Sequence, residues 1–327
     1  MAYQNVGKPR FYINTLEWLS LNWKDTIITD AYRTLPVIPK NHFLPSGTSN
    51  AYTEPVDIPD NIFTDKGFVA ILGHNYQNIG GGEAHIKLSD GNWIEGSGDI
   101  RINCESNNLV SYNGFSIRSF DLSNAINFIQ LHTNQYDDNI SFGSVIIGDY
   151  YDMPHSPDLQ LTMKREYKGI KTIETKGGST LSNNMWKTPM WGDRNAWEVW
   201  DATQELQNQT TLGRSGRRIW TLNFSYLDNS DVFGSNQLLN KSTGNITGLD
   251  SDDYTNSNHN FNLLTDDNFY SQVIHKTNGG QLPFIFQPDS SSASYDNFAI
   301  CKLDNNFQFD QVANNVYNIN LTIREVW

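Results

Sequence analysis

The chain has 327 residues, a length that fits two or three domains. Its 36 acidic and 23 basic residues give a net charge of −13, which argues against a protein built to neutralise nucleic-acid phosphates. Only 18% of the residues are charged, and polarity comes mainly from Asn, Ser, Thr, Asp and Gly. That composition favours a β-rich fold with many turns over long helices.

The two cysteines, Cys104 and Cys301, lie far apart in the chain, so the sequence predicts neither a disulfide framework nor a cysteine zinc site. The longest apolar run, residues 68–72, is much shorter than the roughly 20 residues of a membrane-spanning helix. The first residues lack a basic segment followed by an apolar one, so no signal peptide is expected. We therefore expect synthesis in a cytoplasm, with retention there or assembly into something larger.

Residues 1–66 are expected to form an extended N-terminal arm. Prolines occur in quick succession at positions 36, 39, 45, 55 and 59, and each removes a backbone donor and fixes φ. One short helix is predicted over residues 15–23. The arm is expected to lie either on its own domain or on a neighbouring subunit.

Residues 67–148 are predicted to form one β-sandwich domain. Apolar or alternating segments indicate strands at 67–74, 84–88, 115–121, 125–132 and 140–147. Short strands at this spacing are typical of a sandwich.

Residues 149–327 are predicted to form a second β domain. A strand over 170–176 is broken by Gly177-Gly178, and a cluster of tryptophans follows at 186–200. The alternation over 218–226 places Trp220, Leu222, Phe224 and Tyr226 on one buried face. An exposed loop over 228–264 is expected next, and then a helix over 266–277 that is capped near Thr265 and ends at Asn278-Gly279-Gly280. Further strands are predicted at 282–287, 297–303, 307–312 and 316–326.

No catalytic residue, cofactor site or metal site is expected from the motifs. No two histidines share the local spacing of a metal motif, and no Gly-x-Ser-x-Gly occurs. Asp250-Ser251-Asp252-Asp253 resembles half of a calcium loop, but Tyr254 stands where the pattern needs Asp or Asn, so a solvated loop is preferred. The tryptophan cluster would suit sugar stacking or, as we favour, core or interface packing.

The densest basic patch of the chain lies at residues 213–218. Its arginines could contact phosphate or an acidic neighbour, and the acidic character of the chain favours the second. The candidate intersubunit contacts are therefore Arg214, Arg217, Arg218, Trp186 and Trp191.

Two stretches resemble known structural families. The run Gly213-Arg214-Ser215-Gly216-Arg217-Arg218-Ile219-Trp220 opens one pattern, and Gly279-Gly280-Gln281-Leu282-Pro283-Phe284-Ile285-Phe286 continues it after the predicted helix. This order resembles the tail-tip minor tail protein of lambda-like bacteriophages and the related distal tail proteins, over about residues 160–327. It departs from them in the loop at 228–264. Residues 67–148 resemble a galactose-binding-like jelly roll through Ala70-Ile71-Leu72-Gly73-His74-Asn75 and Ile147-Gly148.

The resemblance implies a mainly β chain with a jelly-roll-like β-sandwich and a C-terminal distal-tail-like β-barrel with one packed α-helix. It also implies a virion protein of a phage tail, assembled in the host cytoplasm. Such a protein would form a homo-hexameric ring near the tail tip, in contact with the tail tube and the tail-tip hub. No nucleic-acid binding is expected, because a negative lumen repels DNA. The alternative is a decoration or baseplate protein whose jelly roll binds host glycan. An enzyme acting on polysaccharide is a third, less favoured reading.

Overall fold

The computed structural model describes residues 6–22, 51–55, 66–72, 84–89, 100–103, 110–112, 115–121, 128–133, 143–159, 161–166, 172–182, 217–233, 266–293, 297–304 and 308–326. In these ranges the chain is mainly β, as the composition predicted. The helices are α1 (Thr15–Asn22), α2 (Asn229–Val232), a π-helical turn (Tyr270–Ile274) and a 3₁₀ turn (His275–Thr277).

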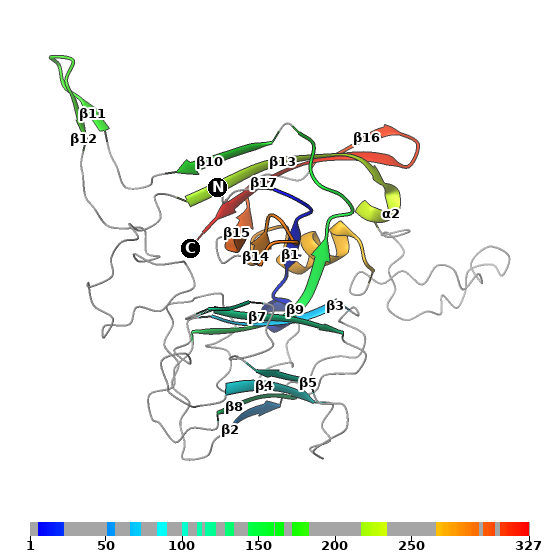
Figure 1. The fold of residues 1–327 in the computed structure, drawn as a ribbon. Coiled ribbons are helices and arrows are strands. Elements are labelled where there is room, and N and C mark those ends of the chain that lie inside the picture. The colour runs from blue at the N-terminus through cyan, green and yellow to red at the C-terminus, as the bar shows by residue number, and fades with distance from the viewer. Residues whose placement is uncertain are drawn as a thin grey trace.

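The strands form one large sheet and two small ones, and every described pairing is antiparallel (Figure 1). The large sheet has the spatial order β10 (Thr162–Glu166), β13 (Arg217–Asp228), β17 (Val316–Glu325), β15 (Ala299–Leu303), β14 (Phe284–Gln287), β1 (Arg10–Tyr12), β9 (Ser144–Asp152), β3 (Lys66–Leu72), β7 (Phe115–Asp121) and β6 (Val110–Tyr112). Strand β16 (Phe309–Ala313) also pairs with β17. The small sheets are β2 (Ala51–Pro55), β8 (Phe128–Thr133), β4 (Ala84–Ser89) and β5 (Ile100–Asn103), and the hairpin of β11 (Thr172–Glu174) with β12 (Thr180–Ser182).

The N-terminal segment lies inside the fold of its own chain. Strand β1 pairs with β14 on one side and with β9 on the other, and α1 follows it directly. Because side chains alternate along a strand, Phe11 enters one hydrophobic core and Tyr12 enters the other. Residues 6–22 are therefore part of the domain core, which differs from the extended arm expected for residues 1–66. The helix predicted at 15–23 is present as α1.

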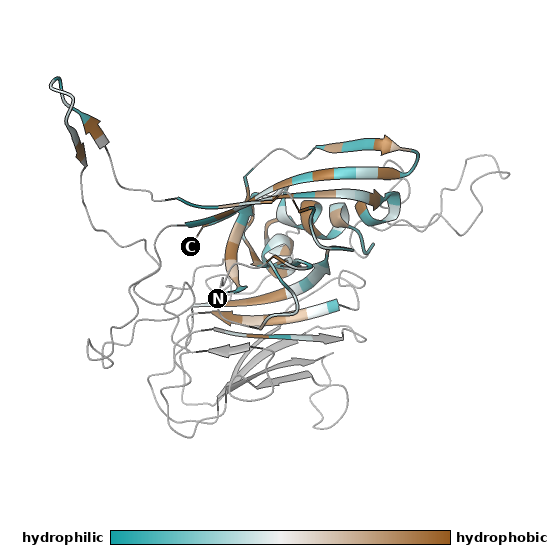
Figure 2. Ribbon diagram, turned by 45° about the horizontal axis from the view of Figure 1, so that its top comes forward, coloured by the Kyte–Doolittle hydropathy of each residue, from teal (hydrophilic) through white to brown (hydrophobic). Residues whose placement is uncertain are grey.

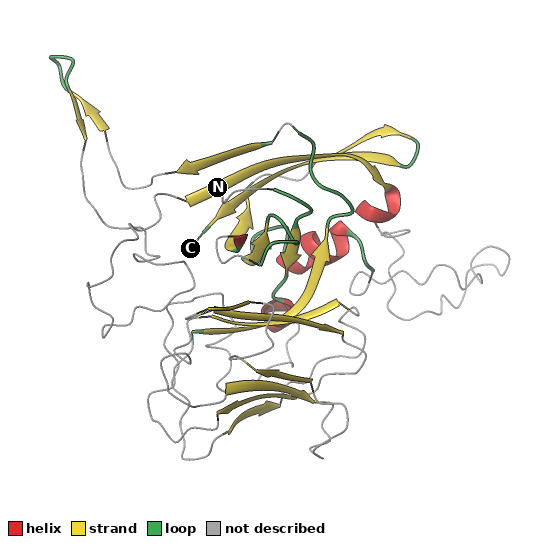
Figure 3. Cartoon of the chain, viewed as in Figure 1, coloured by secondary structure: helices red, strands yellow, loops and turns green. Residues whose placement is uncertain are grey.

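The first hydrophobic core lies beneath the long strands β13 and β17. Their inward residues pack against the aromatic rings of β14 and β1 and against the helical turns at 269–277, which Figure 3 shows in red beneath these strands. Strand β14 is buried on both faces, so Phe284 and Phe286 enter this core while Ile285 enters the second. This arrangement lets one short strand join two packed layers.

The second core is built on β3, β7 and β9. It contains Tyr12, Phe68, Ile146 and Ile300, among others. Strand β9 pairs with β3 through residues 144–149 and with β1 through residues 150–152. The boundary that we placed between residues 148 and 149 thus falls inside one continuous strand, because the same sheet runs through both expected domains. The β2–β8–β4–β5 sheet forms a separate layer beyond β3 and β7 in Figure 1.

The buried face predicted for residues 218–226 is confirmed for three of its four residues. Trp220, Leu222 and Phe224 are buried in β13, but Tyr226 is 83% exposed. A β-bulge shifts the register against β17 between Phe224 and Leu227, so that Leu227 takes the buried place instead. The prediction for Tyr226 was wrong because strict alternation does not anticipate a bulge.

The helix predicted over 266–277 is shorter and irregular. Its helical turns occupy residues 269–277, with π and then 3₁₀ geometry. The oxygen Oδ1 of Asn268 accepts the Ser271 N–H at 2.9 Å, so the cap lies at Asn268 rather than at residues 265–267. The predicted stop is confirmed, because Asn278, Gly279 and Gly280 all have positive φ.

Candidate functional site

Arg218, one of the predicted intersubunit contacts, is only 5% exposed and is bound within its own chain. Its Nε and Nη2 donate to the two carboxylate oxygens of Glu325, each at 3.0 Å, and Nη2 also donates to the Phe298 carbonyl at 2.7 Å. Its guanidinium lies 5.1 Å from the centre of the Trp220 ring. These contacts fix the pairing of β13 with β17 and leave the side chain engaged in the core.

The other predicted contact residues are only partly placed. Arg217 is half-buried at the start of β13, opposite Glu166 of β10. Arg214, Trp186 and Trp191 lie outside the described residues, as do the tryptophan cluster, the half calcium loop and residues 234–264. The loop expected over 228–264 was wrong at its start, where Asp228 ends β13 and residues 229–232 form α2. Of the five residues, the structure describes only Arg217 and Arg218, which are neighbours at the start of β13.

A second buried ion pair joins the helical turns to β9. Lys276 donates to Asp149 Oδ2 at 2.6 Å and to Gln272 Oε1 at 2.8 Å, and both charged side chains are buried. Burial lowers the pKa of Lys276, and the Asp149 carboxylate partly offsets that effect. The pair therefore links the 3₁₀ turn to β9 in the interior of the protein.

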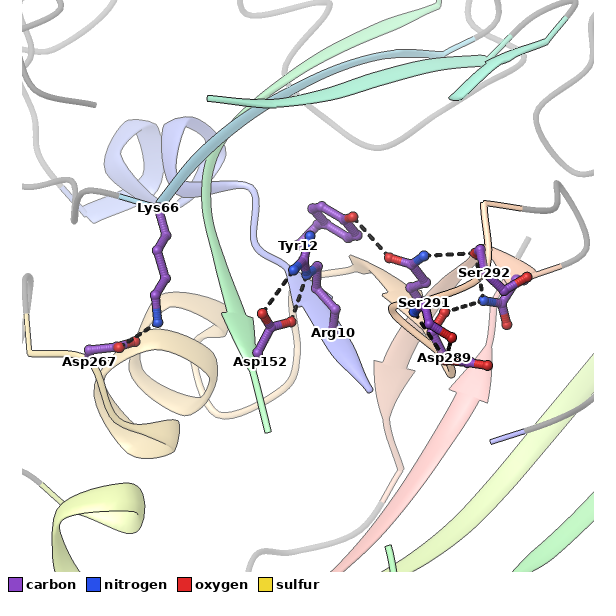
Figure 4. Close-up of polar contacts among 10 residues, drawn as sticks. Arg10, Tyr12, Lys66, Asp152, Asp267, Asp289, Ser291 and Ser292 are labelled. Carbon is purple, nitrogen blue, oxygen red and sulfur yellow. Dashed lines mark hydrogen bonds and ion pairs between the residues drawn. The ribbon is translucent and has the colours of Figure 1, made fainter. Parts of the chain in front are cut away.

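A third ion pair lies where β1 meets β9. Figure 4 shows the Arg10 guanidinium against the Asp152 carboxylate. Arg10 donates to the two carboxylate oxygens at 2.6 and 2.8 Å, and the Tyr12 hydroxyl donates to Gln287 Oε1 at 2.9 Å. The same figure shows Lys66 of β3 paired with Asp267 at the start of the helical turns. These contacts cross between segments distant in sequence and hold the two cores together.

The clearest surface feature is the hairpin of β11 and β12. It forms a sheet of its own, and Figures 1 and 2 draw it apart from the packed layers with hydrophobic colour on both strands. Ile173 and Leu181 are directly opposite one another across the two strands, and they are 64% and 59% exposed. Gly178 has φ of 81° in the turn, where a side chain would be strained. The hairpin thus presents an apolar cross-strand pair to solvent.

Strand β10 lies at one end of the large sheet. Among the described strands it pairs only with β13, so its other edge has no described partner strand. Residues 162–165 are all exposed and include Met163, Lys164 and Arg165. We call β10 together with the hairpin the basic end of the sheet.

The far end of β13 carries a contrasting surface around Tyr226. The backbone of Tyr226 has φ of 61°, a region that bulky residues rarely adopt, and its N–H donates to Asn318 Oδ1 at 3.2 Å. Asn318 is paired with Asp310 of β16, and on the opposite side of β13 Ser225 donates to Asp158 Oδ2 at 2.6 Å. Tyr226 therefore has Asp310 beyond Asn318 on one side of its strand and Asp158 beside Ser225 on the other.

The short helix α2 adds two more carboxylates to that surface. Asp228 caps α2 by accepting from the Ser230 N–H at 3.1 Å, and Asp231 Oδ2 accepts the Asp228 N–H at 3.0 Å. No Lys or Arg occurs in the described stretches 222–233 and 308–320. We call the surface formed by Tyr226, Asp158, Asp228, Asp231 and Asp310 the acidic end of the sheet.

The described ranges contain no group of three or more His, Cys, Asp or Glu residues placed to hold a metal ion. No helix of the described part is long and apolar enough to cross a membrane. Burial raises the pKa of the Cys301 thiol well above its usual value, which disfavours the reactive thiolate.

Comparison with family models, with curated proteins and with solved structures gave no match to this chain.

The hairpin and the acidic end of the sheet could be predicted only in part from the sequence. The Ile/Thr alternation and the Gly-Gly pair located β11 and the turn after it, but β12 and its pairing with β11 were not predicted. The acidic end combines residues near 158, 228 and 310, and only the sheet order brings them together.

Proposed function

We propose that this chain is a structural subunit that assembles with copies of itself, and that the assembly is a ring near the distal end of a bacteriophage tail. The observation that carries self-assembly is the projecting hairpin with its exposed Ile173–Leu181 pair. A two-stranded hairpin is marginally stable in water on its own, and apolar side chains on it gain from burial against a partner.

The assignment to a tail rests on the sequence resemblance of residues 213–226 and 279–289. In this proposal the layers around β3 and β7 correspond to the jelly-roll-like sandwich, and the curved sheet from β13 to β1 corresponds to the distal-tail-like barrel. The ring would contain six copies and would join the tail tube to the tail-tip hub. The net charge of −13 suits a lumen through which DNA passes without binding.

A decoration or baseplate protein that binds host glycan is the alternative proposal. Its site would fall on the sandwich, where only the backbone of the β2–β8–β4–β5 sheet is described. The exposed Ile173–Leu181 pair of the hairpin favours the assembly role, because an exposed apolar pair gains from burial against a partner chain.

The test is the native mass of the purified full-length chain, with negative-stain images of the same sample. The proposal predicts rings with a central hole and a mass about six times the 37.2 kDa of one chain. Closed rings of another size would keep the structural role and change the copy number. A monomer at every concentration tested, with saturable binding of a host glycan, would replace this proposal with the alternative.

A further inference from the structure

The two ends of the large sheet differ in charge and are separated along one strand. Strand β13 begins beside β10 and runs for 12 residues to Asp228, a length of roughly 40 Å. Strand β10 of the basic end pairs with its first residues, and the acidic end lies around its last residues. Each copy of the chain therefore carries two different surfaces far apart on one rigid element.

The basic end has a net positive charge among its described residues. Lys164, Arg165 and Lys176 contribute three positive charges, and Glu166 and Glu174 contribute two negative ones. Lys164 and Lys176 are exposed, and each element also carries exposed apolar side chains: Met163 on β10, and Ile173 and Leu181 on the hairpin. A cationic surface with apolar side chains is suited to an acidic partner that also presents an aromatic ring.

The acidic end has that complementary character. Its four aspartates lie on the elements next to the exposed Tyr226: Asp158 is bound to Ser225, Asp228 and Asp231 follow at the start of α2, and Asp310 lies on β16. Val312 of β16 is exposed as well. The bulge directs the tyrosine to solvent, and the hydrogen bond to Asn318 holds its backbone in place. Aromatic rings accept cations over their faces, and nearby carboxylates strengthen that attraction.

We propose that the occupant of the acidic end is the basic end of a second copy of this chain. The contact is head to tail: the hairpin and β10 of one copy lie against Tyr226 and its aspartates on the next, so that Lys164 and Lys176 face carboxylates. Because the two surfaces differ, the contact is heterologous. Such contacts close into a ring when the rotation from one copy to the next divides a full turn. The inference rests on the proposed self-assembly and names the surfaces that make it.

A charge-swap experiment on the full-length chain tests the contact. Variant A carries Lys164→Glu and Lys176→Glu, so both of its ends are acidic. Variant B carries Asp228→Lys and Asp310→Lys, which reverse two of the four aspartates and cancel the net negative charge of its acidic end. We expect each variant alone to associate at least about tenfold more weakly than the wild type, and an equimolar mixture to assemble again. Lys8→Glu, at an exposed position outside both ends, is the control and should leave assembly unchanged.

A photocrosslinking residue in place of Ile173 gives a second readout that does not depend on the stability of the variants. In a mixture of ¹⁴N- and ¹⁵N-labelled chains, we expect interchain crosslinks to peptides that contain residues 226–231 or 308–313. Crosslinks between two hairpins would overturn the head-to-tail contact.

The outcomes separate this inference from the proposed function. If the wild type and both variants form equal rings, the ring stands and the assigned contact is wrong. If the wild type remains monomeric and the mixture of A and B does not assemble, both proposals fail. Assembly of the mixture but not of either variant alone supports both.

Discussion

The Lys276 ammonium donates to Asp149 Oδ2 at 2.6 Å in the interior of the protein, with side-chain exposures of 0% and 1%. Lys276 belongs to the 3₁₀ turn that ends the helical segment, and Asp149 lies in β9 where that strand passes from β3 to β1. The ion pair thus ties the helical segment to the strand shared by both cores. Its removal is a direct test of how those layers are held together.

Replacing Lys276 by Met is expected to destabilise the chain by about 3–5 kcal/mol, because it leaves the Asp149 carboxylate buried without its charged partner. Adding Asp149→Val should recover a large part of that loss. Urea unfolding measures both changes. The control is Lys66→Met, which breaks the exposed pair with Asp267 and should cost less than about 1 kcal/mol. Equal costs for the two lysines would contradict the buried position of Lys276.

Gly148 is expected to tolerate no side chain. A Cβ there would lie 1.9 Å from the Ile13 carbonyl oxygen and 2.7 Å from the Thr15 nitrogen, which are backbone atoms of the segment between β1 and α1. Gly148→Ala should therefore lower stability by about 3 kcal/mol or more, since the N-terminal segment must move. Thermal unfolding checks this, with Gly177→Ala in the open hairpin turn as the matched control. A neutral Gly148→Ala would show that residues 13–15 do not pack on β9.

The raised pKa of Glu17 in α1 leads us to expect that the stability of the protein depends on pH. Burial raises its pKa from 4.5 to about 7, although Asn14 donates to its carboxylate at 3.1 Å. Between these two values the folded protein binds more protons than the unfolded chain, so stability falls as pH rises through this window. The stabilising contribution of Glu17 is fully present below about pH 4.5 and is lost above about pH 7. Partial exposure reduces its expected size to about 2 kcal/mol.

The measurement is urea unfolding at a series of pH values from 5 to 8. Glu17→Gln should remove this part of the slope and should be more stable than the wild type at pH 8, because the neutral amide does not charge. Glu174→Gln changes an exposed carboxylate in the hairpin and should leave the slope as it is. An unchanged slope in Glu17→Gln would refute the role of Glu17.

We expect the substitution Tyr226→Gly to have opposite effects on stability and on assembly. A bulky residue at φ of 61° is strained, so Tyr226→Gly should raise stability by about 1 kcal/mol. The same change removes the exposed ring and should weaken self-association. Unfolding of the monomer and sedimentation at several concentrations measure the two effects. A loss of stability on Tyr226→Gly would mean that the ring packs on the protein and is not directed to solvent.

The sequence patterns located most of the strands, because alternation and apolar runs are local. The strand predicted at 115–121 coincides with β7, and the strand predicted at 316–326 coincides with β17 to within one residue. Strand β1 was missed because three residues between a proline and a helix give no periodic signal. Its place between β14 and β9 depends on partners more than 130 residues away.

The candidate site was less accessible to sequence reasoning. Arg218 had the appearance of a surface cation in a basic patch, and its partner Glu325 is 107 residues away. Tyr226 followed the apolar alternation and was displaced by a bulge that no local rule announces. The two ends of the sheet became apparent only from the strand order.

The most direct test of self-assembly through the hairpin is a comparison of native masses by sedimentation, between the wild type and the variant Ile173→Ser, Leu181→Ser at equal concentration. Both changes are in exposed positions of the hairpin, so the thermal unfolding temperature should be preserved. The account predicts a closed ring of several 37.2 kDa chains for the wild type and a monomer for the variant. A monomeric wild type, or rings of the same mass in both proteins, would contradict it.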